Sequence, residues 1–189
     1  VVPEITVRTL LGLWAAPVRR LAWRIIGKYG LPNESTAHML VWLGNTPWKR
    51  TVLYHGGPVH RFPYSHYDQL EQIVEYRVPV EKIGELMAFN GSLGANRTRG
   101  ELFVCCANEE LNMAIVNLAH AIVMGEQTVD QARGKLAEVV QARRLRWPVA
   151  LTQRLQFDAS SLEVEHGTPG TADPDHHAIR SELVRAVTE

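Results

Sequence analysis

Apolar residues in the first thirty positions recur at the spacing of an amphipathic helix. Seven of them fall within roughly 120° of arc at the α-helical period, and Arg side chains occupy much of the opposite side. Pro17 interrupts the pattern. We therefore predict a helical arm over residues 1–30 that lies on the rest of the domain. Its apolar stripe consists of Leu10, Leu11, Trp14, Val18, Leu21, Ala22 and Ile25.

Two apolar runs, residues 39–43 and 48–55, are rich in β-branched and aromatic side chains. The tetrapeptide between them, Gly-Asn-Thr-Pro, is typical of a turn. The pattern predicts an antiparallel hairpin over residues 38–55. A similar short run predicts a third strand near residues 101–106.

The segment after the hairpin has the apolar spacing of a helix. A serine that suits a helix N-cap is followed by Leu70, Ile73 and Val74 on one helical face. We predict a helix over residues 65–76. A second short helix is expected over residues 79–90, because its first residue is a proline.

The longest apolar segment covers residues 109–124 and is apolar nearly all round, which indicates a central, buried helix. Thr128 and Gln131 then form the pattern of a capping box. They predict a charged helix that runs to about residue 146. Residues 151–157 are expected to form an edge strand.

The last part of the chain changes in composition. Residues 158–173 are rich in Ser, Gly, Thr, Glu and Pro, which is typical of a mobile linker. Residues 174–189 then have Ile179, Leu183 and Val187 on one helical stripe. We predict a C-terminal helix there.

Strands and helix pairs without regular β-α-β alternation indicate an α+β fold. We expect a small antiparallel sheet that is covered by helices and is formed by the hairpin and the third strand. The predicted organisation is a helical N-terminal arm (1–30), an α+β core (31–157), a linker (158–173) and a C-terminal helix (174–189).

The composition excludes some classes of protein. A chain of 189 residues with 46% hydrophobic residues suits one globular domain with additions. Its 20 basic residues balance its 20 acidic residues, so bulk charge does not favour nucleic-acid binding. The sequence has no apolar run as long as a membrane span.

The two cysteines, Cys105 and Cys106, are neighbours in a predicted strand and should point to opposite faces. They are therefore not expected to bond to each other, which indicates free thiols, a reducing compartment and a cytoplasmic location. A thiol just before a helix can become nucleophilic. Packing is nevertheless the role that we favour, because the histidine of the following helix is too far away to activate it.

Four potential ligands or catalytic groups follow the hairpin. His55, His60 and His66 are candidate metal ligands, because imidazole suits zinc and other divalent transition metals. His60, His66 and Asp68 are the candidate catalytic residues. Their spacing matches no standard motif, so surface or hydrogen-bonding roles are the alternative.

Three polar residues interrupt the central apolar helix. We predict that Asn117 and His120 are internal and that at least one of them forms a hydrogen bond outside its own helix. The favoured role is a structural tie to the loop over residues 91–100. The alternative is a polar binding pocket formed by Arg99, Glu101, Asn112, Asn117 and His120.

Residues 53–57, Leu-Tyr-His-Gly-Gly, resemble the first strand of ADP-ribosyltransferases, in which a Tyr/His-Gly element contacts NAD. That family also has a second strand with a Ser/Thr-Tyr element and a late catalytic Glu in a sheet. The sequence does not show these features, so we do not carry the assignment over.

These patterns lead to three functional hypotheses. The first is a protein without catalysis that binds a partner chain or itself through residues 4–29 and 174–187. The second is a small-molecule enzyme with a His/Asp site, with or without a divalent metal, between the sheet and the central helix. The third, which Pro17 disfavours, is a membrane-surface protein in which Trp14, Leu21 and Ile25 insert into the lipid.

Overall fold

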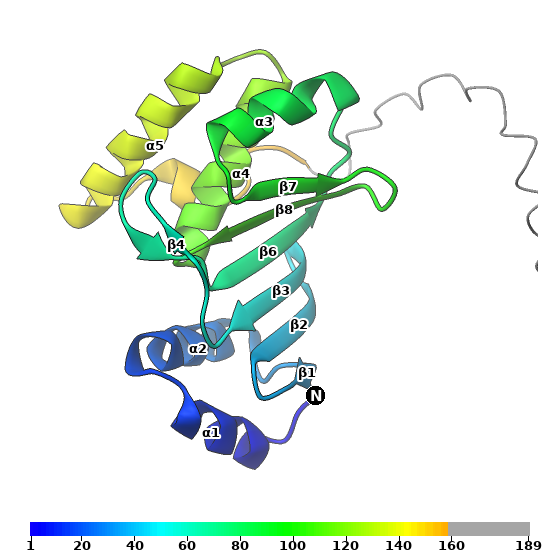
Figure 1. Cartoon of the computed structure of the whole chain (residues 1–189), viewed down its shortest axis with the longest axis vertical. Coiled ribbons are helices and arrows are strands. Elements are labelled where there is room, and N and C mark those ends of the chain that lie inside the picture. Colours follow the sequence, from blue (N-terminus) through cyan, green and yellow to red (C-terminus); the bar gives the residue numbers. More distant parts are fainter. Residues whose placement is uncertain (159–189) are drawn as a thin grey trace, which may run out of the picture.

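A six-stranded antiparallel sheet forms the centre of the computed structural model, which describes residues 1–158 (Figure 1). The strand order is β1-β2-β3-β6-β8-β7, and β2 and β3 are the predicted hairpin. The α+β fold class is therefore confirmed. The strands are β1 (Glu34–Ser35), β2 (Met39–Asn45), β3 (Trp48–Tyr54), β6 (Leu70–Glu75), β7 (Leu93–Asn96) and β8 (Glu101–Cys106).

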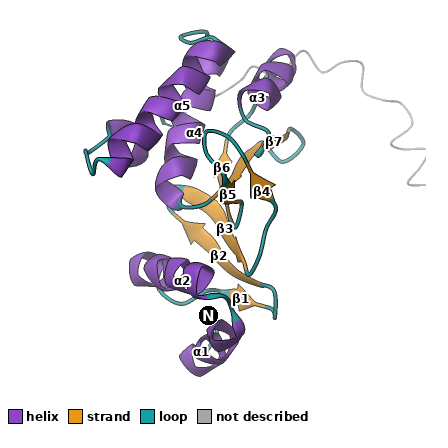
Figure 2. Ribbon diagram, turned by 60° about the vertical axis from the view of Figure 1, so that its left-hand side comes forward, coloured by secondary structure: helices purple, strands orange, loops and turns teal. Residues whose placement is uncertain are grey.

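The helices cover one face of this sheet (Figure 2). Leu40, Leu53, Leu70 and Cys106 are register partners on four adjacent strands, so their side chains share that face. Helices α1 and α2 pack over the β2–β3 half, and α4 packs over β6 and β8. The helices are α1 (Glu4–Leu13), α2 (Ala16–Tyr29), α3 (Ile83–Phe89), α4 (Glu109–Val123) and α5 (Val129–Arg144), with short 3-10 helices at Val80–Lys82 and Ala150–Thr152.

The N-terminal arm is helical, and the predicted interruption at Pro17 divides it into two helices, α1 and α2. The proline fits the first turn of α2, where its missing N–H costs nothing. The apolar stripe of the arm is buried against Leu40, Trp42 and other side chains of the sheet. The arm thus uses its apolar side to cover half of one sheet face.

The predicted helix over residues 65–76 is wrong. Residues 70–75 form β6, which lies between β3 and β8. Leu70 and Val74 are buried on the helix-covered face and Ile73 on the other, so the apolar spacing of this central strand imitates a helix. The predicted edge strand over residues 151–157 is also wrong, because the 3-10 helix Ala150–Thr152 and turns occupy this stretch.

Capping signals in the sequence correctly predicted where α4 and α5 begin. Asn108 caps α4, and the capping box of α5 forms between Thr128 and Gln131. The predicted linker from residue 159 onward and the predicted helix over residues 174–189 lie outside the described residues.

Candidate functional site

A short hairpin between β3 and β6 carries the residues of the candidate site. Strands β4 (Val59–His60) and β5 (His66–Tyr67) pair so that His60 lies opposite His66. Opposed side chains of an antiparallel pair lie on the same face. The Asp68 amide donates to the Pro58 carbonyl at 3.0 Å, which continues the pairing toward the sheet. Cross-strand register therefore brings together residues that match no linear motif.

His60, His66 and Asp68 form a compact cluster. His60 Nδ1 lies 3.5 Å from Asp68 Oδ2, and His66 Nε2 lies 3.1 Å from Asp68 Oδ1. One ligand atom from each residue lies within 4.8 Å of the others. In a tetrahedral zinc site with bonds of 2.0–2.1 Å, ligand atoms are about 3.3 Å apart. The two nitrogen–oxygen distances match this spacing, and the widest separation, up to 4.8 Å, would have to shorten for one cation to bind all three groups.

The hydrogen bonds of His66 determine which nitrogen faces the carboxylate. Nδ1 lies 2.8 Å from the Tyr64 carbonyl, so it carries a proton and donates. Nε2 then faces Asp68 Oδ1, a buried atom that accepts no well-aligned hydrogen bond from the described residues. Two lone pairs at this distance repel, so a second proton or a metal ion must lie between them. A backbone carbonyl on the remote nitrogen is the usual orienting contact of a metal-bound histidine.

The two imidazoles have opposite pKa shifts. Burial lowers the pKa of His66, but the contacts with Asp68 and Cys106 outweigh burial and raise this pKa to about 10. Burial lowers the pKa of His60, and the nearby Asp68 offsets this only in part. Without a metal ion, the cluster therefore holds an imidazolium at His66 and a neutral imidazole at His60 near neutral pH.

Ser92 completes the cluster from the turn before β7. Its Oγ donates a hydrogen bond to Asp68 Oδ2 and lies 3.2 Å from His60 Nδ1. The Asn90 side chain accepts a hydrogen bond from the Ser92 amide at 2.9 Å and so fixes the turn. One carboxylate oxygen of Asp68 thus has the Ser92 hydroxyl as a donor, and the other oxygen faces His66 Nε2.

The contacts do not form a nucleophile–histidine–acid triad. In such a triad, the nucleophile and the acid contact opposite nitrogens of the histidine. Here Cys106 and Asp68 both face Nε2 of His66, and Ser92 and Asp68 both face Nδ1 of His60. Cys106 is also only 1% exposed. The arrangement therefore favours metal binding or acid–base chemistry over covalent catalysis.

His55 lies apart from this cluster. Its ring centroid is 4.8 Å from that of His38 and 6.1 Å from that of Trp14. Among the described residues, the group suited to a metal ion comprises His60, His66 and Asp68. The structure thus brings together the predicted catalytic set, and Asp68 replaces His55 as the third candidate ligand.

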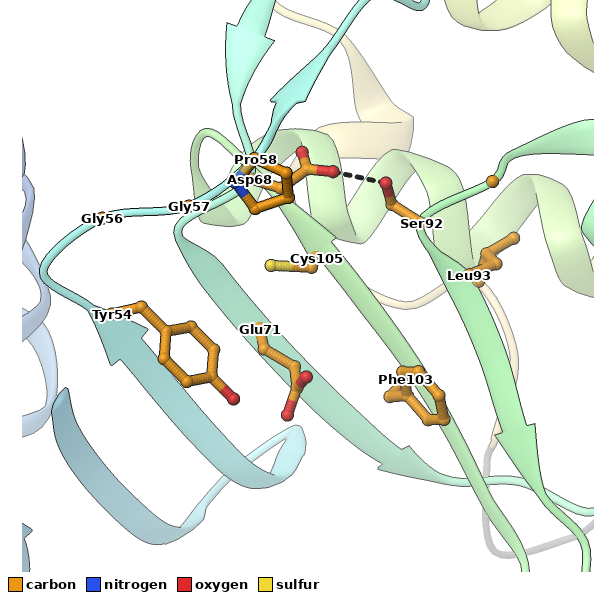
Figure 3. Close-up of a pocket in the computed structure, with 11 residues that line it drawn as sticks. Tyr54, Gly56, Gly57, Pro58, Asp68, Glu71, Ser92, Leu93, Phe103 and Cys105 are labelled. Atoms are coloured by element: carbon orange, nitrogen blue, oxygen red, sulfur yellow. Dashed lines mark hydrogen bonds between the residues drawn. The ribbon is translucent and has the colours of Figure 1, made fainter. Parts of the chain in front are cut away.

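A pocket of about 440 Å³ lies beside Asp68 and Ser92 (Figure 3). Glu71 and Cys105 line it from β6 and β8, on the face of the sheet opposite the helices. The enzyme hypothesis predicted a pocket between the sheet and the central helix, but this pocket opens on the opposite face of the sheet. Gly57 and Asp68 both line this pocket, and their close approach requires glycine at position 57, because a Cβ there would lie 1.8 Å from the Asp68 carbonyl oxygen.

Asn117 is internal and forms hydrogen bonds outside its own helix, as predicted. Its Nδ2 donates to the carbonyls of Leu151 and Arg154, both at 2.9 Å, and its Oδ1 accepts from the Gln156 amide at 2.8 Å. The expected tie to the loop over residues 91–100 is wrong, because the partners belong to the segment after α5. All three contacts are to backbone, so Asn117 has a structural role.

The other members of this predicted pocket bond to different parts of the fold. His120 is half-buried, with Nδ1 3.0 Å from the Tyr76 hydroxyl and its ring stacked on Phe157. Asn112 is fully buried, and its Nδ2 donates to the Leu70 carbonyl. Glu101 pairs with Lys49 at 3.0 Å, and Arg99 is exposed in the turn between β7 and β8.

No pattern in the sequence indicated the role of Glu109, whose largely buried carboxylate joins three parts of the fold. Oε1 accepts hydrogen bonds from the Tyr29 hydroxyl, from Trp48 Nε1 at 2.6 Å and from Gln72 Nε2 at 3.3 Å. Oε2 accepts one from Lys28 Nζ at 2.9 Å. Four donors thus satisfy this carboxylate and connect α2, the sheet and α4.

Comparisons of the chain with protein-family models, with curated proteins and with solved structures found no match. The function is therefore argued from the chemistry of the residues at the site.

Proposed function

We propose that the protein is a small-molecule enzyme that holds a divalent transition-metal ion between His60, His66 and Asp68. The observation that carries this proposal is the approach of His66 Nε2 to the buried Asp68 Oδ1, with His60 Nδ1 beside the other oxygen, so that a metal ion can replace the proton between His66 and Asp68. A metal ion would accept both lone pairs at once. Two imidazoles and one carboxylate suit zinc, and also iron or manganese.

The number of ligands supports a catalytic role. Three protein ligands leave at least one coordination position for water or substrate, whereas structural zinc sites use four protein ligands. A metal at such a site supplies an activated water or polarises a carbonyl or phosphoryl oxygen. Asp68 and Ser92 also line the pocket, so a small molecule in it would lie beside the ligand set. We therefore propose hydrolysis as the reaction class.

The chain's own residues would position this centre. The Tyr64 carbonyl orients the ring of His66, and Ser92 holds the second oxygen of Asp68. His60, with its lowered pKa, remains neutral and free to ligate near neutral pH.

The partner-binding hypothesis has less support. The apolar stripe in residues 4–29 covers the protein's own sheet, so it does not call for a partner. Residues 174–187 lie outside the described part of the chain. Trp14, Leu21 and Ile25 are buried, which also weakens the membrane-surface hypothesis. Within residues 1–158, no helix is both long and apolar enough to cross a membrane.

Calorimetric titration with zinc tests the proposal. The full chain, prepared without an affinity tag and treated with a chelator, should bind about one equivalent. Asp68→Asn should weaken binding by about a hundredfold or more, because it removes a ligand rather than an outer contact. His55→Gln is the matched control, because the chain contains eight histidines and His55 lies outside the cluster. The proposal fails if the wild type binds no zinc or if D68N binds it like the wild type.

Activity assays with chromogenic esters and phosphates then address catalysis. We expect turnover by zinc-loaded wild type and by the His55→Gln variant. Chelation should abolish this turnover, and added zinc should restore it. Turnover that persists in Asp68→Asn would exclude this cluster as the active site.

A further inference from the structure

The pocket on the uncovered face of the sheet contains a carboxylate that no described residue neutralises at close range. Glu71 lies in the middle of β6, between Val52 on β3 and Cys105 on β8, and points into the pocket (Figure 3). Within the described residues, the Glu71 side chain forms no hydrogen bond and no ion pair, although the residue is half-buried. Burial raises its pKa, and Arg50 partly opposes this shift. A half-buried carboxylate of this kind needs an outside partner more than a fully solvated one does.

Aromatic rings stand on both sides of this carboxylate. Tyr54 projects from β3 and Phe103 from β8, with Glu71 between them (Figure 3). The Phe103 ring lies over the backbone of Gly94, where a Cβ would come within 2.1 Å of the ring. Aromatic faces attract organic cations, and together with a carboxylate they form a favourable site for an ammonium group.

The charge of the lining excludes an anion and favours a cation. Among the described residues, the pocket is lined by two acidic side chains, Glu71 and Asp68, and by no Lys, Arg or His. Arg50 is the basic group that acts on Glu71, and its guanidinium lies 4.0 Å from Glu101 instead of closing the pocket. Burial raises the pKa of the Cys105 thiol, which therefore stays neutral and adds apolar surface.

We infer that this pocket binds a small organic amine, with its ammonium group at Glu71 and its apolar body between Tyr54 and Phe103. A volume of about 440 Å³ is within the usual range for small-molecule sites. The other end of such a molecule would lie near Asp68 and Ser92, beside the proposed metal ligands. The inference stands apart from the metal proposal, because Glu71 and the two rings make no contact that requires a metal.

A pair of probes that differ in charge tests this inference. Phenethylamine and 2-phenylethanol have the same aromatic body, but only the amine is cationic at neutral pH. Calorimetric titration onto the chelator-treated full chain should show that the amine binds at least about tenfold more tightly than the alcohol. Glu71→Gln should remove this preference. Glu75→Gln should keep it, because Glu75 lies on the same strand and face but outside this pocket.

A second variant tests the aromatic wall without changing charge. Phe103→Leu should weaken the amine by about threefold or more and affect the alcohol less, because it removes a cation–π contact. Equal affinities for the two probes, no binding of the amine, or an unchanged amine preference in Glu71→Gln would overturn the inference. These outcomes do not depend on zinc binding, because the chelator-treated protein is assayed without added zinc.

Discussion

Two buried carboxylates of this protein, Glu109 and Asp68, differ in how completely their oxygens are satisfied. Glu109 accepts hydrogen bonds from four side chains, and its own side chain is 12% exposed. Asp68 is more buried, at 6%, and within residues 1–158 the Ser92 hydroxyl is its one well-aligned hydrogen-bond donor. The remaining oxygen of Asp68 faces an imidazole nitrogen that is either protonated or bound to a metal.

The difference separates a structural role from a functional one. Four donors from α2, β3 and β6 make Glu109 a tie between elements, and nothing about this group calls for a ligand. The second oxygen of Asp68 depends on one titratable partner, the His66 ring, and a metal ion can take the place of the proton between them.

Glu109→Gln should lower the free energy of unfolding by about 3 kcal/mol, because the Lys28, Tyr29 and Trp48 donors would then face an uncharged amide. Chemical denaturation measures this change. The matched control is Glu110→Gln, next to it in the first turn of α4, where an exposed pair with Arg143 at 3.6 Å should contribute less than about 0.5 kcal/mol. Equal effects of the two variants would mean that Glu109 is not the structural tie.

Asn117→Leu should lower the free energy of unfolding by about 2 kcal/mol, because three backbone groups of residues 151–156 lose their partner. Zinc binding should remain unchanged, since none of these groups belongs to the cluster at Asp68. Denaturation together with zinc titration checks both parts. Loss of zinc binding in a folded variant would contradict the structural role given to Asn117.

The zinc affinity should rise about tenfold per pH unit between about pH 7 and 8. His66 has a pKa raised to about 10, so the metal-free protein holds a proton on its ring throughout this range, and zinc must displace it. His60 should not add a second proton, because its pKa is lowered. Calorimetry in buffers of different ionisation enthalpy should show about one proton released per zinc ion. A pH-independent affinity would contradict this assignment.

Glu109 should also contribute to acid sensitivity. Burial tends to raise its pKa, but hydrogen bonds from Tyr29, Trp48 and Lys28 outweigh burial and lower it. A lowered pKa means that the contribution is fully present above the ordinary value of 4.5 and is lost as the pH falls through the pKa of the folded state. Between about pH 5 and 3, the wild type should therefore lose about 1 kcal/mol more than Glu109→Gln. Parallel losses would show that Glu109 is not stabilised as a carboxylate.

The sequence predicted the parts of the fold that local signals determine. The turn at residues 44–47 determines the β2–β3 hairpin, and the capping box determines the start of α5. The strand β6 was missed because the apolar Ile73 lies on the face opposite the helices and the polar Gln72 on the covered face, which hides the alternation of a strand. That error also concealed the β4–β5 pairing.

The candidate site was predicted only in part, because local signals do not show which residues pair across strands. His60, His66 and Asp68 are close in sequence, so their chemistry could be suspected, but their meeting depends on the hairpin register. Ser92 reaches the cluster from a distant turn, and no local pattern marks it. The partners of Glu109 are likewise 37 to 81 residues away along the chain, so only tertiary packing brings them together.

Zinc K-edge X-ray absorption on the full chain loaded with one equivalent of zinc is the most direct test of this contrast. The account predicts scattering from two imidazole rings and a carboxylate oxygen, with bonds of about 2.0–2.1 Å. The spectrum should be the same in Glu109→Gln and should change in Asp68→Asn. A spectrum without imidazole scattering, or one that D68N leaves unchanged, would contradict the assignment of His60, His66 and Asp68 as the metal centre.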